Sequence, residues 1–245
     1  MKSYRQRPLN DRIKTVQTAT KNMLARPPLV VKLAKKEYNA AALNEGRALA
    51  DTADAAIVES GNLLGDKKAA TDHAGRCLKA AHAVTAVFAK LSRAIFVDQP
   101  DVLAILGLDA TLPKARNAYI TAAKQMFNSS HYTNAMKTKL DKNEWTSTEL
   151  SEARGKIAEL EAALIAQVQC KADYETGTDT QRKAIKAMDK WMAMFIKVAR
   201  LVFADEPQEL ERLNVTTRST PTKKQRAARV ARKQLKLKLK LTKAA

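Results

Sequence analysis

The chain repeats part of its own sequence at a spacing of 107 residues. The segment RAIFVDQPDVLAIL, from Arg93 to Leu106, is followed by RLVFADEPQELERL, from Arg200 to Leu213, and six of the fourteen positions are identical without a gap. The same spacing pairs Phe88 with Phe195. An internal repeat of this length predicts two similar structural modules in tandem.

The composition favours helices over sheets. Alanine, leucine and lysine abound among the 245 residues, whereas glycine and proline number seven each and aromatic residues make up 5%. We therefore predict an all-α protein with two tandem helical-bundle repeats and basic terminal helices. Four segments are predicted: a basic amphipathic N-terminal helix over 1–28, a first helical repeat over 29–110, a second repeat with its leading helix over 111–215, and a basic C-terminal helix or tail over 216–245.

Apolar residues spaced three or four apart predict the individual helices. The first should cover about residues 9–25, with an apolar stripe at Leu9, Ile13, Val16, Thr20 and Met23. In the first repeat we expect a helix from near Val30 or Tyr38 to about residue 58, a turn at Gly61, Asn62 and Gly65, and a helix over about 66–97. In the second repeat we expect helices over about 147–171 and 178–204, with a turn near Gly177.

The best-matched block predicts a short capped helix that turns the chain at one end of each bundle. Its aspartate can accept hydrogen bonds from the free amides of the helix, and its proline fits the first helical turn. The glycine or asparagine after the last leucine tolerates the left-handed backbone that ends many helices. This predicted structural corner consists of Asp98, Pro100 and Gly107 in the first repeat and of Asp205, Pro207 and Asn214 in the second.

The formal net charge of +19 is concentrated at the two ends of the sequence. Residues 1–36 carry a net charge of +9 and residues 212–245 carry +12, whereas residues 37–211 carry −2. Lys223 to Lys233 (KKQRAARVARK) interleaves six bases with alanine and valine, which suits a polyanion because each base can neutralise a phosphate. The tail contains no aromatic residue for stacking on bases, so any nucleic-acid binding should be mainly electrostatic.

The segment Leu235 to Leu241 (LKLKLKL) alternates leucine with lysine. An extended strand would place the leucines on one face, where they could join a sheet edge, lie on an anionic membrane or pair with another copy. A solvated disordered tail or a continuation of the preceding helix is equally compatible with the pattern.

No residue pattern predicts a catalytic, cofactor or metal site. His73 and Cys77 stand four apart, as two zinc ligands can, but neither Asp66 nor Asp72 clearly joins their face as a third ligand. There is no glycine-rich phosphate loop, no paired Cys-x-x-Cys and no setting for a nucleophilic serine. The sequence therefore predicts neither an enzyme nor a small-molecule substrate.

The expected location is the cytoplasm. No stretch reaches eighteen consecutive apolar residues, and the basic N-terminus lacks the apolar run of a secretory signal. Cys77 and Cys170 do not correspond at the repeat spacing, so two free thiols in a reducing compartment is the simplest interpretation.

A non-enzymatic structural or scaffolding protein is the leading functional prediction. It would self-assemble as a homo-oligomer or filament, or dock partners, through its basic terminal helices. The alternative is a nucleic-acid or other polyanion-binding protein that uses both basic ends electrostatically, and attachment to an anionic membrane comes third. The residues predicted to contact the polyanion or partner are Arg5, Arg7, Arg12, Lys14, Lys223, Lys224, Arg226, Arg229, Arg232, Lys233, Lys236, Lys238 and Lys240.

Overall fold

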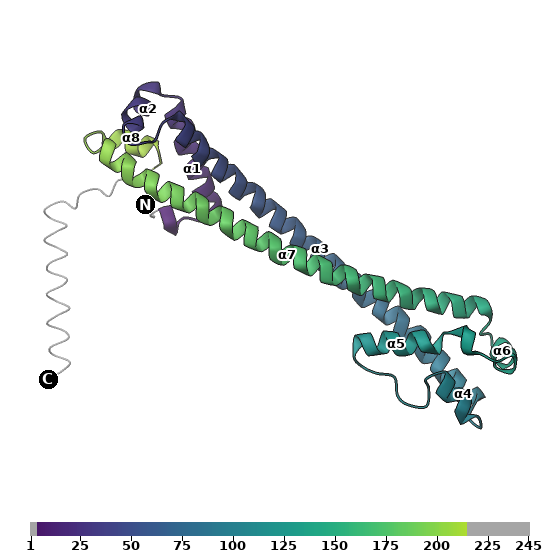
Figure 1. Cartoon of the computed structure of the whole chain (residues 1–245). Coiled ribbons are helices and arrows are strands. Elements are labelled where there is room, and N and C mark those ends of the chain that lie inside the picture. Colours follow the sequence, from purple (N-terminus) through teal and green to yellow (C-terminus); the bar gives the residue numbers. More distant parts are fainter. Residues whose placement is uncertain (1–3, 215–245) are drawn as a thin grey trace, which may run out of the picture. The chain divides into compact units, whose positions relative to one another are not determined.

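The computed structural model of the chain describes residues 4–214 (Figure 1). Over this range the chain forms eight α-helices and two single-turn 3₁₀ helices and contains no strand, so the all-helical prediction is confirmed. The elements in order are η1 (Tyr4–Gln6), α1 (Leu9–Leu24), α2 (Pro27–Ala34), α3 (Ala40–Ile95), α4 (Pro100–Ile105), α5 (Arg116–Met126), η2 (Ser129–His131), α6 (Asn134–Asp141), α7 (Ser147–Val202) and α8 (Pro207–Arg212).

The chain forms two compact units. Unit 2 is the continuous stretch Ala55–Lys183, whereas unit 1 joins the residues up to Asp54 with those from Ala184 onward. The long helices α3 and α7 each contribute to both units. Unit 1 therefore takes its helices from both the first and the last part of the described chain.

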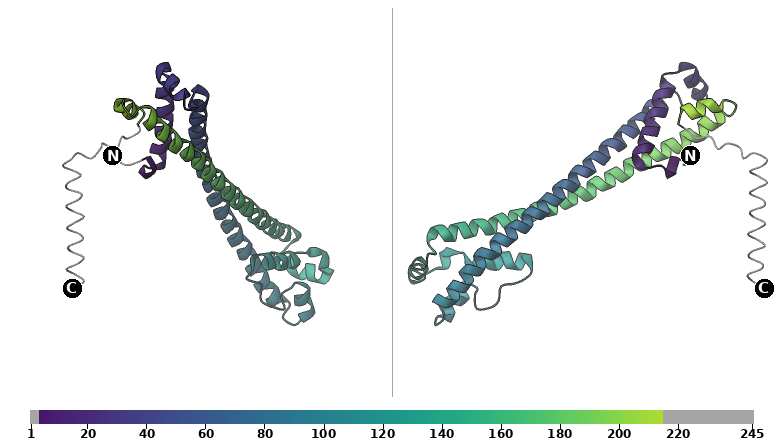
Figure 2. Two further views of the ribbon diagram at one scale, coloured as in Figure 1. Left: turned by 60° about the vertical axis from the view of Figure 1, so that its left-hand side comes forward. Right: turned by 180° about the vertical axis from the view of Figure 1, so that it is seen from behind.

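Unit 1 is built around the apolar stripe of α1. Ile13, Val16 and Met23 are at most 3% exposed, as the three-to-four spacing of the stripe predicts. In the views of Figures 1 and 2, α1, α2 and α8 gather around the first part of α3 and the last part of α7. The buried Leu43 of α3 and Phe195 of α7 belong to the same unit, so its buried residues come from the early and the late part of the described range.

Unit 2 holds a second core, lined by α3, α5, α6 and α7. Its centre is aromatic: the ring of Phe88 lies 5.0 Å from that of Phe127 and 4.7 Å from that of Trp145, the second contact being edge-to-face. Phe88 and Phe127 are fully buried. Tyr119 of α5 is also buried, and its hydroxyl lies 2.7 Å from that of Thr85.

The predicted turns inside the long helices are wrong. Each of α3 and α7 is an uninterrupted helix of 56 residues that runs through Gly61, Gly65 and Gly177. A glycine inside a helix lowers its stability by only about 1 kcal/mol, which does not by itself end a helix. Gly177 also has a packing role in unit 2, since a Cβ atom there would lie 2.4 Å from Cδ1 of Leu63 on α3.

The predicted corners occur at α4 and α8, but one detail of the prediction is wrong. Pro100 and Pro207 are the first residues of these helices, and Gly107 (φ +66°) and Asn214 (φ +56°) follow them in the left-handed region. Asp98 and Asp205 do not cap the helices. Each aspartate stands one residue before the N-cap position, which is occupied by Gln99 in α4 and by Glu206 in α8. Neither Gln99 nor Glu206 makes a side-chain capping hydrogen bond.

Gly46 of α3 and Trp191 of α7 form a close contact in unit 1. A Cβ atom on Gly46 would lie 2.2 Å from the indole, and that indole stacks on Phe195 at 5.2 Å with an interplanar angle of 10°. At the 107-residue spacing the two positions correspond to Ala153 and Val84 of unit 2, where the first residue is larger and the second smaller. In unit 1 the small residue Gly46 therefore makes room for the large side chain of Trp191.

Replacing Gly46 by alanine should destabilise the protein by up to about 2 kcal/mol. Forcing a methyl group into a packed site costs roughly 1–3 kcal/mol, and the better helix propensity of alanine offsets about 1 kcal/mol of that cost. Urea unfolding followed by circular dichroism measures the change. Gly155→Ala is the control, because no neighbouring atom lies within 4 Å of a Cβ there and the substitution should be neutral or stabilising. In a Trp191→Val background the Gly46→Ala cost should vanish, and an unchanged cost would contradict the contact.

Candidate functional site

The excess positive charge is associated with unit 1. Its described residues, 4–54 and 184–214, contain fifteen Lys and Arg against ten Asp and Glu, a net charge of +5. Unit 2 contains seventeen against fifteen, a net charge of +2. Residues 215–245, which follow directly on Asn214, add eleven bases and no acid. The described residues at both ends of the range 4–214 therefore belong to one compact unit, and this unit carries the larger net positive charge.

Asp189 of α7 anchors the N-terminal segment in unit 1. Its carboxylate accepts a hydrogen bond of 2.9 Å from the hydroxyl of Tyr4 and forms an ion pair with the guanidinium of Arg12. Burial and the adjacent carboxylate raise the pKa of the Tyr4 hydroxyl well above its usual value, so the hydroxyl remains a donor. The side chains of Arg12 and Asp189 are only about one-fifth exposed, and Arg12 therefore serves mainly to hold the fold together.

The end of the described chain is fastened beside α1 and α2. Arg7 donates a hydrogen bond of 3.2 Å to the backbone carbonyl of Asn214, and Asn22 donates one of 2.9 Å to the backbone carbonyl of Arg212. Two ion pairs join the same elements: Arg26 with Glu209 at 3.0 Å, and Lys32 with Glu206 at 2.5 Å. The point from which the eleven further bases continue is thus fixed next to the basic N-terminal helices.

The residues predicted to contact a polyanion fall into three groups. Arg5 and Lys14 are exposed on unit 1 and available to a ligand. Arg7 and Arg12 are engaged within the fold. Arg7 also donates a hydrogen bond of 2.8 Å to the hydroxyl of Thr15, and Arg12 forms the ion pair with Asp189. The nine predicted C-terminal bases, from Lys223 to Lys240, lie outside the described residues, as do the alternating segment Leu235–Leu241 and its alternative conformations.

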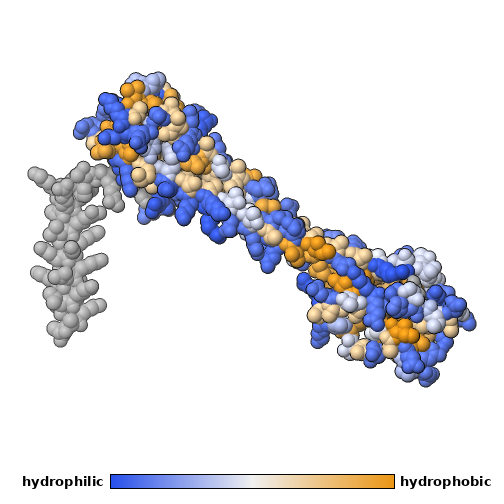
Figure 3. Space-filling view, viewed as in Figure 1, coloured by the Kyte–Doolittle hydropathy of each residue, from blue (hydrophilic) through white to orange (hydrophobic). Residues whose placement is uncertain are grey.

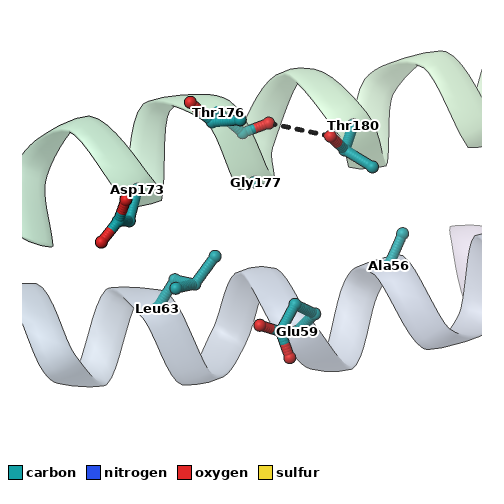
Figure 4. A pocket seen from close by; sticks show the side chains of 7 residues that line it. All are labelled: Ala56, Glu59, Leu63, Asp173, Thr176, Gly177 and Thr180. Carbon is teal, nitrogen blue, oxygen red and sulfur yellow. Dashed lines mark hydrogen bonds between the residues drawn. The ribbon is translucent and has the colours of Figure 1, made fainter.

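A shallow pocket of about 320 Å³ opens in unit 2 between α3 and α7 (Figure 4). The side chain of Leu63 extends from α3 toward Gly177 of α7, and the acidic groups of the lining are Glu59 and Asp173. A 3.0 Å bond from the Thr180 hydroxyl to the carbonyl of Thr176 stays within α7.

A second cluster in unit 2 unites three side chains that can ligate metals. His73 and Cys77 of α3 lie on one face, with Sγ of Cys77 3.8 Å from either ring nitrogen of His73. Glu159 of α7 completes the group, and the donor atoms of the three residues all lie within 4.8 Å of one another. Burial, followed by the nearby carboxylate of Glu159, raises the pKa of the Cys77 thiol. The sequence pointed to His73 and Cys77 but missed Glu159, because nothing local indicates which turn of another helix faces them.

The chain was compared with protein-family models, with curated proteins and with solved structures, and none of them matches it. Among the helices of residues 4–214, none combines the length and apolarity required to cross a membrane. The large apolar side chains that are exposed in this range, such as Val58 and Val87, are scattered over several helices, and the visible face of the molecule is mainly hydrophilic (Figure 3). Functional inference therefore depends on charge and local geometry.

Proposed function

We propose that this protein is a non-enzymatic polyanion-binding protein whose ligand is a nucleic acid. The binding surface would comprise the exposed bases of the N-terminal helices of unit 1, including Arg5 and Lys14, together with residues 216–245. The observation that carries the proposal is the attachment of Asn214 beside α1 through Arg7, since it brings the start of the basic C-terminal segment to the basic N-terminal helices.

The chemistry of such a surface is electrostatic. Each lysine or arginine that neutralises a phosphate releases a condensed counterion, and the resulting gain in entropy drives association. Contacts of this kind read the backbone and not the base sequence. We therefore expect binding to duplex DNA and to RNA with little preference for sequence.

The proposal is tested by measuring the affinity of the full chain for labelled mixed-sequence DNA and RNA over a series of salt concentrations. With six or more phosphate contacts, the logarithm of the association constant should fall against the logarithm of salt with a slope of about −5 or steeper. Replacing Arg5 and Lys14 by glutamine should make the slope shallower by about 1 to 2. The matched control replaces two exposed lysines of unit 2, Lys79 and Lys90, and should leave the slope unchanged. A flat salt response in the full chain would refute the proposal.

A self-assembling scaffold is the second proposed function, and the internal repetition favours it. Self-assembly through the N-terminal helix is disfavoured. The apolar stripe of α1 is already buried in unit 1, so this helix has no apolar face left for another copy. Assembly would then depend on residues 216–245 alone. Sedimentation over a range of protein concentrations separates the two proposals, because a chain that remains monomeric while it binds DNA fits only the first.

We further propose that the chain consists of two copies of one repeat of about 107 residues. Three pairs of helices support this proposal, since α6, α7 and α8 begin and end 107 residues after α2, α3 and α4. Residues in the left-handed region have the same spacing: Glu144 (φ +64°) follows Glu37 (φ +69°), and Asn214 follows Gly107. In this arrangement each compact unit combines the first part of one copy's long helix with the last part of the other's.

A further inference from the structure

We propose that His73, Cys77 and Glu159 form a binding site for a single Zn²⁺ ion in unit 2. Imidazole, thiolate and carboxylate are the three kinds of side chain that bind zinc in proteins, and one of each is present here. The site is independent of the proposed polyanion surface, since all three residues belong to unit 2.

The spacing of the donor atoms fits a zinc ion. Bonds of about 2.0–2.3 Å in a tetrahedral arrangement place ligand atoms about 3.3–3.8 Å apart. The Sγ atom of Cys77 is 3.8 Å from each ring nitrogen of His73, so these two donors already have a separation at the upper end of this range. The carboxylate lies within 4.8 Å of both, and a small rotation of the exposed Glu159 side chain would close the remaining distance.

The surroundings allow an ion to enter and to be held. Cys77 is 5% exposed and belongs to the unit 2 core beside Ala74 and Ala81, so its position is fixed by packing. His73 and Glu159 are exposed at the edge of that core and face solvent. An ion can therefore approach from water, bind the two exposed groups and reach the thiol, whose proton is released to solvent as the thiolate–zinc bond forms.

The mixture of donors also selects among metals. A thiolate disfavours Mg²⁺ and Ca²⁺, which prefer oxygen ligands, whereas zinc accepts sulfur, nitrogen and oxygen in one site. Three protein ligands leave a fourth position for a water molecule. The corresponding positions in the other copy of the proposed repeat hold Thr180, Ala184 and Thr52, which provide no such set, so the site should occur once per chain.

The test titrates the full chain with Co²⁺ as a spectroscopic substitute and with Zn²⁺ in competition. We expect one ion per chain, with a thiolate-to-cobalt charge-transfer band and the visible bands of a tetrahedral ion. Cys77→Ser should abolish the charge-transfer band. His73→Gln and Glu159→Gln should each weaken Zn²⁺ binding by at least tenfold, because even residues outside the ligand shell of zinc sites contribute about 10–100-fold.

Cys170→Ser is the matched control, because it removes the half-buried thiol of α7 and leaves the cluster intact. In this background Zn²⁺ should also protect Cys77 from a thiol reagent, a readout that does not depend on the folding of a Cys77 variant. Absence of the charge-transfer band in the full chain, loss of that band in Cys170→Ser, or unchanged Zn²⁺ affinity in Glu159→Gln would each overturn the proposal.

Discussion

A chain that ends at Val215 should bind duplex DNA roughly 10³-fold more weakly than the full chain at about 0.1 M salt. The deletion removes eleven bases and no acid. If about six of these bases contact phosphates, the salt slope should become shallower by about 5, because each contact contributes about 0.9. Fluorescence anisotropy with a labelled duplex measures both quantities.

The deletion leaves the attachment of the chain end in place. Ending at Val215 keeps the Asn214 carbonyl in a peptide bond, so its hydrogen bond from Arg7 persists and unit 1 should retain its stability. A second variant keeps the length and replaces five bases by glutamine: Lys223, Lys224, Arg226, Arg229 and Arg232. This variant should lose most of the same affinity, since the effect comes from charge. An undiminished slope in the truncated chain would mean that the C-terminal bases do not contact the polyanion.

Helix type and helix faces could be predicted from the sequence because they depend on local patterns. The three-to-four spacing of Ile13, Val16 and Met23 predicted the buried face of α1, and these side chains are at most 3% exposed. The proline that opens each corner helix and the left-handed residue that follows it were predictable for the same reason, since both depend on the φ angles that a residue type permits.

The continuity of α3 and α7 could not be predicted from local signals. Gly61 and Gly65 resemble a turn in the sequence, but the helix retains its backbone hydrogen bonds there, and glycine removes none of them. A glycine is present at position 177 because Leu63 of another helix approaches it closely, and this contact is visible only in three dimensions.

The candidate sites depend on contacts between residues far apart in the sequence. The charge pattern showed two basic ends in the sequence, but it could not show that Asn214 lies beside the N-terminal helices, because that placement depends on Arg7 reaching the carbonyl of Asn214. Similarly, the spacing of His73 and Cys77 identified two ligands on one helical face, whereas the third, Glu159, comes from another helix. Periodicity describes which face of a helix is apolar and does not say which helix covers it.

Phe88→Ala should destabilise unit 2 by about 3–5 kcal/mol. Phe88 is fully buried, and its ring contacts both Phe127 and Trp145, so the substitution leaves a cavity and removes two aromatic contacts. Urea unfolding followed by tryptophan fluorescence measures the loss. The chain has two tryptophans, Trp145 in unit 2 and Trp191 in unit 1, so single-tryptophan variants report on each unit separately.

The effect of Phe88→Ala should appear mainly in the Trp145 transition, because the cavity opens beside that indole and the core around Trp191 is not changed. Val87→Ala is the matched control: the neighbouring side chain is 60% exposed, and its removal should change stability by no more than about 0.5 kcal/mol. Equal shifts of the Trp145 and Trp191 transitions would mean that the continuous helices α3 and α7 make both units unfold as one. A shift no larger than that of Val87→Ala would contradict the placement of Phe88 at the centre of the unit 2 core.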